Sequence, residues 1–257
     1  MAARAEDESP PKANRDREIA PTADRDRDRA SQRIAPTAAE NHDQEIAPTI
    51  APTVPSDTKK RLAGTIALGA LIALAIPIGL YAFGFQFAGI GDPNFHARFS
   101  ATPLMAAFHV LGGGSALLLG GAQFSRRLRS RAPQLHRWSG RVYLTLVLIG
   151  GIGGATLALH AAGGLSARIG FMLLAILWLT SGTLAYRAIR AGNVAEHRRW
   201  MTRNFALTFA AVTLRIWLPT LTIGFGFPWD EAYPTVAWLA WVPNLLVAEW
   251  LILRRTA

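Results

Sequence analysis

Six long apolar runs, joined by short polar turns, constrain this chain more than any other feature of its sequence. A membrane-spanning helix needs about 20 mainly apolar residues, and each run is of that length. The sequence therefore predicts an all-α fold, a polytopic membrane helix bundle with six transmembrane helices. The expected spans are residues 62–84, 102–124, 138–160, 168–188, 204–227 and 234–253.

Basic residues gather in the turns on one side of these runs. Segments on the side of the N-terminus hold 16 lysines and arginines, whereas the opposite loops hold only Arg98 and Arg168. Cytoplasmic loops of membrane proteins carry such an excess, so both termini are expected in the cytoplasm and the protein in the bacterial inner membrane. A net charge of +10 suggests nucleic acid in a soluble protein. Here the charge lies in membrane turns, so the expected partner is the lipid bilayer and not nucleic acid.

The first 58 residues differ in composition from the remaining 59–257, which form the expected transmembrane domain. This segment holds 12 acidic and 8 basic residues and is poor in aromatic side chains. It also carries four copies of the tetrapeptide Ile-Ala-Pro-Thr, which begin at Ile19, Ile34, Ile46 and Ile50. A segment with so little apolar surface to bury does not offset its ordering entropy, so residues 1–58 are predicted to be a disordered cytoplasmic tail.

Some function classes are excluded by residues that the sequence lacks. The chain has no cysteine, which rules out disulfides, cysteine-ligated clusters, thiolate-bound haem and cysteine nucleophiles. It also carries no hydrolase triad, phosphate loop or metalloprotease motif. An enzyme that acts alone is therefore not expected.

Small residues recur at helical spacing in the second and third expected spans. One face of the second span holds His109, Gly112, Gly113, Ala116 and Gly120, and the third span holds Gly140, Gly150, Gly151 and Gly154. Such residues let two helix backbones approach closely. Helix packing is the favoured interpretation, and a gap that is kept open for a flat cofactor is the alternative.

Four histidines in the helical part are candidate ligands, because neutral imidazole binds haem iron and other metals. His136 and His197 lie at the inner ends of their spans and form a candidate pair of haem ligands. His109 and His160, nearer the outer surface, form a second candidate pair, although their depths differ by about 10 Å. His136 and His160 point about 120° apart on one helix, so they do not form the one-face pair that two stacked haems require.

A polar stripe runs along the fifth expected span and ends at Arg215. His197, Asn204, Thr208, Ala211 and Arg215 share one helix face. An arginine near mid-membrane needs a partner or a wet cavity. Arg215 is therefore expected to point into the bundle, towards His109, and to hold backbone carbonyls, a haem propionate or a quinone-like ligand. Glu249 is too shallow to meet Arg215 easily, so its expected neighbour is Arg254.

The order of several short motifs resembles one known family. The motifs are His109-x-x-Gly112-Gly113, Gly120-x-x-Gln123-Phe124, Leu135-His136-Arg137-x-x-Gly140-Arg141-Val142-Tyr143, Ala185-Tyr186-x-x-Ile189-Arg190-x-Gly192, His197-Arg198-x-Trp200-Met201-x-Arg203 and Leu214-Arg215. Together they resemble the bacterial membrane family called domain of unknown function 2306. The resemblance implies a multi-span inner-membrane protein and implies no activity. The histidines, glycines and arginines also have a looser resemblance to b-type transmembrane cytochromes.

Three functional hypotheses follow. The first is a redox membrane protein linked to haem b or quinone, with His136 and His197 as iron ligands, Arg203 or Arg215 as propionate partner, and His109 at a second site. The second is a small-solute transporter, with the stripe from Asn204 to Arg215 along its path. The third is a non-catalytic scaffold or sensor that displays the tail. A homo-oligomer and a membrane redox partner are candidate assemblies.

Overall fold

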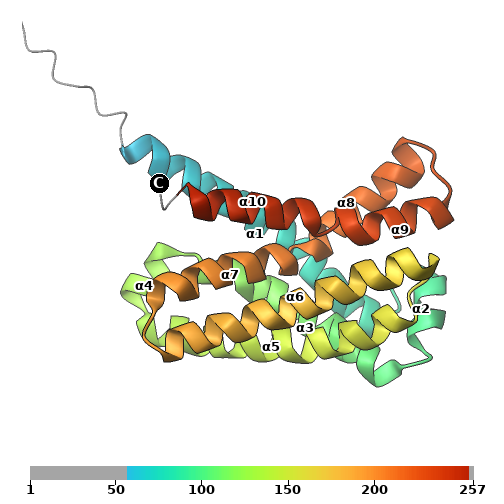
Figure 1. Cartoon of the computed structure of the whole chain (residues 1–257), viewed down its shortest axis with the longest axis horizontal. Helices are drawn as coiled ribbons and strands as arrows, with labels where there is room; N and C mark the ends of the chain where they lie inside the picture. The colour runs from blue at the N-terminus through green and yellow to red at the C-terminus, as the bar shows by residue number, and fades with distance from the viewer. Residues whose placement is uncertain (1–56, 255–257) are drawn as a thin grey trace, which may run out of the picture. The chain divides into compact units, whose positions relative to one another are not determined.

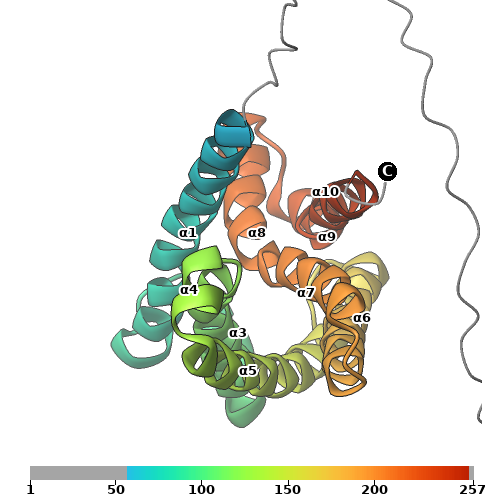
Figure 2. The same ribbon diagram turned by 90° about the vertical axis from the view of Figure 1, so that its left-hand side faces the viewer.

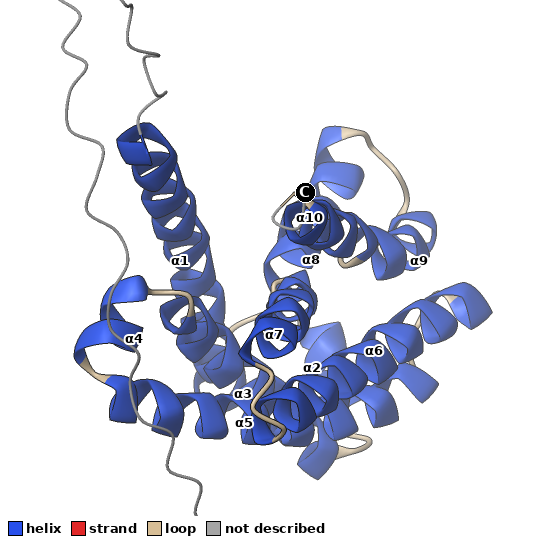
Figure 3. Ribbon diagram, turned by 60° about the vertical axis from the view of Figure 1, so that its left-hand side comes forward, coloured by secondary structure: helices blue, strands red, loops and turns tan. Residues whose placement is uncertain are grey.

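The computed structural model describes residues 57–254, and every regular element in that range is helical (Figures 1 and 3). Six of its helical segments are long and apolar enough to cross a membrane. The predicted all-α, six-span fold is therefore confirmed. The predicted tail, apart from its last two residues, lies outside the described residues, so its disorder and the role of its repeats stay predictions.

The first four spans are single helices, close to the expected ranges. They are α1 (Asp57–Ala88), α3 (Pro103–Gln123), α5 (Pro133–Leu159) and α6 (Gly164–Arg190), with the short helices α2 (Pro93–Phe99) and α4 (Arg126–Arg131) in two of the connections. Three of these helices begin with proline, which is favoured there because the first helical residue needs no N–H partner. The tight turn between α5 and α6 depends on Gly163, whose φ of 81° is left-handed.

The fifth and sixth spans, expected at about 204–227 and 234–253, are broken helices. The fifth consists of α7 (Val194–Thr208), α8 (Ala210–Pro219) and the π-helical turn η1 (Thr220–Gly224), and the sixth of α9 (Trp229–Leu239) and α10 (Val242–Leu253). Proline explains two of the breaks. Pro219 has no N–H to continue the α-helical ladder, and Pro243 opens the first turn of α10.

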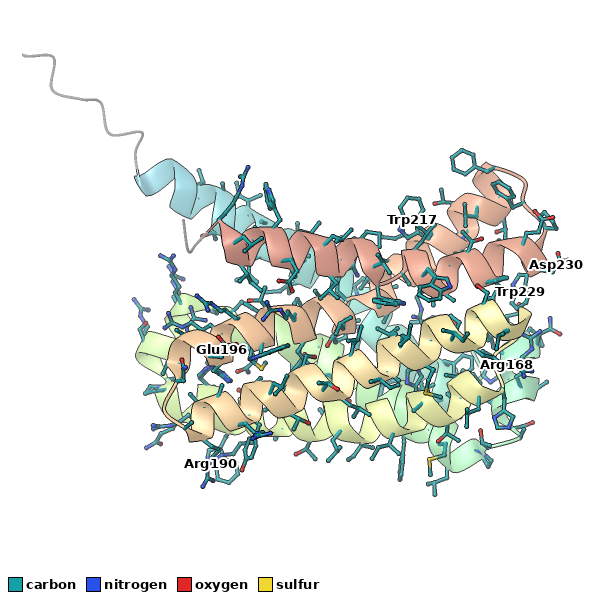
Figure 4. All side chains as sticks on the ribbon, in the orientation of Figure 1. Arg168, Arg190, Glu196, Trp217, Trp229 and Asp230 are labelled. Atoms are coloured by element: carbon teal, nitrogen blue, oxygen red, sulfur yellow. The ribbon has the colours of Figure 1, made fainter. Side chains whose placement is uncertain are left out.

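The connections divide between the two ends of the bundle. Figure 1 shows α4, the α6–α7 turn and the start of α1 at one end, here called the arginine-rich end. At the other end, here called the α2 end, lie α2 and the α5–α6 and α8–α9 loops. Figure 4 accordingly places Arg190 and Glu196 at the first end, and Arg168, Trp229 and Asp230 at the second.

Glycine sets the closest helix packing, between α3 and α5. A Cβ added at Gly112 would lie 2.9 Å from the Cα of Gly150, and one added at Gly153 would lie 2.7 Å from the backbone nitrogen of His109. Neither position has room for a side chain unless a backbone moves. This part of the glycine pattern therefore serves helix packing, as small residues do in membrane proteins.

A buried hydrogen-bond network ties α5, α6 and α7 together around Tyr143, which is 0% exposed. The Tyr143 hydroxyl donates to Asn204 Oδ1 at 2.7 Å and lies 2.8 Å from Thr208 Oγ1. Asn204 Nδ2 donates to the Trp178 carbonyl at 2.8 Å and to Ser181 Oγ at 2.9 Å, while Trp178 Nε1 donates to Thr208 Oγ1 at 2.8 Å. These bonds fix how the three helices rotate against one another, because a buried polar group without a partner is costly.

The network predicts that Tyr143→Phe destabilises the bundle. The substitution keeps the ring but leaves Asn204 Oδ1 without its hydroxyl donor, at a cost of about 1 kcal/mol. The measurement is thermal unfolding of the purified protein in detergent. Tyr186→Phe is the matched control, since Tyr186 is 48% exposed, and it should leave the unfolding temperature unchanged. Equal effects of the two variants would contradict a stabilising role for the network.

Candidate functional site

A cavity of about 580 Å³ lies inside the bundle towards the α2 end. Residues from α1, α2, α3, α5, α6, α7, α8 and α9 line it. Figure 2 shows the arrangement of the helices as seen from the arginine-rich end. Its lining extends along the fifth span from Leu207 to Thr222, which is roughly 20 Å at the rise of a helix. Its volume falls within the range of about 300–1,000 Å³ that is typical of small-molecule sites.

Most of the cavity wall is apolar. Ile78, Val110, Leu117 and Leu214 are typical of its aliphatic lining, and the rings of Phe85, Phe95, Phe99 and Phe171 add aromatic surface. Polar side chains are fewer: His109 and Arg215 lie at mid-height, Thr208 at the floor, and Asp92 and Arg98 at the mouth, and the lining also includes Thr102, His160 and Thr222. A mainly apolar wall with a few polar groups is the usual composition of a ligand pocket.

Arg215 contributes the charge at mid-height. Its Nη1 donates to the carbonyl of Ala211 at 2.9 Å, and its guanidinium carbon lies 5.0 Å from the centre of the Tyr81 ring. In the described part of the chain, the two ion pairs are Arg199–Glu196 and Arg203–Glu249, so no carboxylate pairs with Arg215. The prediction that Arg215 points into the bundle is confirmed, because Arg215 and His109 line the same cavity.

His109 lines the same cavity from α3, and its ring is fixed by α5. The Nδ1 atom lies 3.0 Å from the carbonyl oxygen of Gly150. A carbonyl oxygen only accepts, so Nδ1 carries the proton, and in the neutral ring Nε2 is then an acceptor. A Cβ added at Gly154 would lie 2.8 Å from Nδ1, which shows how closely α5 packs against this imidazole.

Gly113, next to the tightly packed Gly112, faces open space. A Cβ added at Gly113 would have nothing within 4 Å, and the residue lines the cavity. The glycine pattern therefore serves helix packing at one residue and borders open space at the next, and a flat cofactor in that space stays a prediction. Gly112 allows the helices to touch, and Gly113 leaves part of the cavity wall flat.

The floor of the cavity is the buried network. Thr208 and Trp178 belong both to the network and to the cavity lining. Asn204, one turn earlier, is 0% exposed and does not line the cavity. The expected stripe from Asn204 to Arg215 is thus divided, since Thr208, Ala211 and Arg215 face the cavity while Asn204 is enclosed by protein.

Aromatic side chains surround the mouth of the cavity. The Arg98 guanidinium carbon lies 4.8 Å from the centre of the Trp229 ring, and Trp229 stacks on Tyr233 with ring centres 4.4 Å apart. Asp92 caps α2 by accepting from the backbone of Asn94 at 2.7 Å. The cavity therefore has a charged, aromatic mouth above an apolar interior.

The proposed inner histidines lie away from this cavity. His136, in the first turn of α5, and His197, in the first turn of α7, interact electrostatically with each other at the arginine-rich end. His197 Nδ1 donates to the Ala185 carbonyl at 2.9 Å, whereas His136 Nδ1 is buried and has no hydrogen-bond partner in the described structure. Neither residue lines the cavity, and their binding of haem iron stays a prediction.

Arg203 has a carboxylate partner that the sequence did not suggest. Its Nε and Nη2 atoms donate to the two carboxylate oxygens of Glu249 at 2.5 Å and 2.9 Å, which joins α7 to α10. The expectation that Glu249 neighbours Arg254 was wrong, because Glu249 faces Arg203 on α7. Arg254 lies instead over the ring of Trp250, at 3.7 Å. With its donor fork used in this pair, Arg203 is less suited to a propionate than Arg215.

The chain matches one known protein family. One family model, described as a predicted membrane protein (DUF2306), matches residues 106–252, more than half of the chain. The chain belongs to the DUF2306 family. The resemblance found in its motifs is thereby confirmed, while the looser resemblance to b-type cytochromes stays a prediction. No curated protein and no solved structure matches the chain.

The DUF2306 match covers most, but not all, of the cavity. His109, Gly113, Thr208 and Arg215 lie inside the matched range. The α1 and α2 residues of the lining, such as Tyr81, lie outside it. The mid-height polar groups therefore belong to the part of this DUF2306 protein that the family model describes.

The sequence did not indicate the roles of three cavity residues, Tyr81, Trp178 and Arg98. Tyr81 lies in a uniformly apolar run, where one tyrosine gives no distinct signal. Trp178 looked like any other apolar residue of its span. Arg98 was counted only as a loop charge, although an arginine close to several aromatic residues could have indicated a structured mouth.

Proposed function

We propose that this DUF2306 protein binds a membrane-soluble small molecule whose carbonyl or oxyanion group is held by Arg215. A quinone-like compound is the class that fits, because it combines an apolar body with carbonyl oxygens. The apolar walls would take the body, and the guanidinium would donate to the oxygen. This proposal keeps the quinone part of the redox hypothesis and assigns no electron transfer.

The observation that supports this proposal most is the environment of Arg215. Placing arginine at the centre of a membrane helix costs about 2.5–3.5 kcal/mol on insertion scales. In the described structure the guanidinium donates one hydrogen bond, from Nη1 to the backbone carbonyl of Ala211, so most of its five N–H donors are left for another acceptor. Buried charges are otherwise paired, and a ligand acceptor would complete the set.

The test is a titration of the purified wild-type protein with a short-chain quinone, read as tryptophan fluorescence. Trp178 and Trp229 line the cavity, so a bound quinone should quench their emission in a saturable way. Gly113→Leu should weaken binding at least about tenfold, or about 1.4 kcal/mol, because the new side chain occupies the cavity. Gly69→Leu is the matched control, since Gly69 is exposed on α1 and is expected to bind as the wild type does.

Two results of this titration would contradict the proposal. One is quenching in the wild type that rises linearly without saturation, as simple partition into detergent gives. The other is saturable quenching that Gly113→Leu leaves unchanged, which would place the quinone elsewhere.

We further propose that the arginine-rich end faces the cytoplasm of a bacterial inner membrane. Reporter fusions after residues 130 and 194, which lie in the α4 and α6–α7 turns, should report the cytoplasm. Fusions after residues 92, 164 and 230, at the α2 end, should report the outside. The physical reason is the 16-to-2 division of basic residues between the two sides. Two reversed reports would contradict this topology.

A further inference from the structure

We infer that the molecule bound in the cavity carries a hydroxyl group as well as a carbonyl, and that His109 accepts from this hydroxyl. The expected class is a hydroxylated aromatic carbonyl compound, such as a hydroxybenzoate-like molecule. The inference rests on the proposed function, since it describes the ligand of the same cavity.

The orientation of His109 supports an acceptor role. Its Nδ1 is committed as donor to the Gly150 carbonyl at 3.0 Å. A neutral imidazole has one donor and one acceptor nitrogen, so the remaining Nε2 is the acceptor. A ligand that offers only carbonyl oxygens cannot hydrogen-bond to an acceptor, and would leave Nε2 unsatisfied in an apolar site. A hydroxyl group supplies the missing donor.

Arg215 provides the complementary donor close by. The guanidinium and the imidazole line the same cavity and interact electrostatically. The Arg215 guanidinium only donates, and the neutral His109 imidazole accepts through Nε2. The pair therefore matches a molecule with an acceptor oxygen and a donor oxygen, and a simple quinone, which has only acceptors, would satisfy half of it.

The neighbouring wall favours a flat molecule. Gly113 presents no side chain to the cavity, and a Cβ there would meet nothing within 4 Å. Tyr81, Phe85 and Trp178 add aromatic faces elsewhere in the lining. Aromatic rings pack well against such surfaces, so the hydroxyl is expected on an aromatic ring.

Two matched probes test the inference: a butyl ester of 4-hydroxybenzoic acid, and the same ester with the hydroxyl methylated. Both keep the carbonyl for Arg215, and only the first can donate to His109. Wild-type protein should bind the hydroxy ester about tenfold more tightly than the methoxy ester, the effect expected for one hydrogen bond in a buried site. Dissociation constants come from the tryptophan quenching titration.

Two variants separate the roles of the polar groups. His109→Asn keeps an N–H that can donate to the Gly150 carbonyl, and its amide oxygen, on a shorter side chain, does not reach the position of Nε2. The preference for the hydroxy ester should therefore disappear, while the affinity for the methoxy ester stays unchanged. Arg215→Leu should weaken both esters about equally and keep the preference. A purely structural role of His109 would weaken both esters in the asparagine variant.

The outcomes distinguish the inference from the proposed function. Saturable binding of both esters with equal affinity to the wild type would overturn the hydroxyl inference and leave the cavity as the site. A preference that His109→Asn leaves intact would also overturn it. If neither ester nor the short-chain quinone shows saturable binding, the proposed function fails, and the inference fails with it.

Discussion

Replacing Arg215 with leucine is expected to weaken binding of a short-chain quinone by about 10-fold to 100-fold while the six helices still fold. A hydrogen bond to a charged group contributes about 1.5–3 kcal/mol, which corresponds to this loss of affinity. The substitution also removes a charge from the middle of the membrane. Insertion of the fifth span should therefore be as efficient as in the wild type, or more efficient.

The measurement combines the quinone titration with size-exclusion chromatography of the same preparation. A leucine variant that elutes as the wild type does and has lost affinity supports a direct role of Arg215 in binding. Arg215→Lys keeps the charge but loses the planar fork of donors, so its affinity should lie between those of the wild type and the leucine variant. Arg190→Leu, an exposed change at the opposite end, is the control and should not change binding (Figure 4). Full affinity in Arg215→Leu would refute the proposed role.

The same leucine substitution at two adjacent glycines is expected to destabilise the protein at one position and not at the other. Gly112→Leu should lower the unfolding temperature by about 6–12 °C, because overpacking costs up to about 3 kcal/mol and here the Gly150 backbone lies 2.9 Å from the new Cβ. Separating α3 from α5 would also break the bond between His109 and the Gly150 carbonyl, so binding should fall as well.

Gly113→Leu is the matched control for that prediction. Its Cβ enters open space, and leucine favours a helix more than glycine does, so the unfolding temperature should stay within about 2 °C of the wild type. Thermal unfolding in detergent measures both variants. The prediction fails if Gly112→Leu is as stable as Gly113→Leu, because the two glycines would then not differ in the way that the structure requires.

The sequence correctly predicted the features that depend on a single helix. The first four spans follow from apolar runs of membrane length, and the inward direction of Arg215 follows from the cost of exposing a charge to lipid. The breaks in the last two spans were not predicted, because a membrane helix can contain proline without breaking. Both Pro77 and Pro219 lie in apolar runs, yet α1 continues through the first, whereas α8 ends at the second and is followed by a π-helical turn.

The candidate site was only partly predictable for a related reason. Its members His109 and Arg215 were found because buried ionisable groups in a membrane are rare. Tyr81 and Trp178 were not found, since their role depends on which helix lies opposite. The glycine pattern likewise could not say which glycine touches a neighbour and which borders a cavity.

By itself, therefore, the sequence determined the membrane class, the number of spans and the two polar groups that need a partner, because these follow from the transfer of each segment out of water. Only the tertiary structure decided that Glu249 pairs with Arg203, that Asn204 is enclosed with Tyr143, and that Gly113 borders a cavity. These outcomes depend on the rotation and the bend of each helix against its neighbours. Many distant side chains fix that rotation together, and the pattern within one span does not contain it.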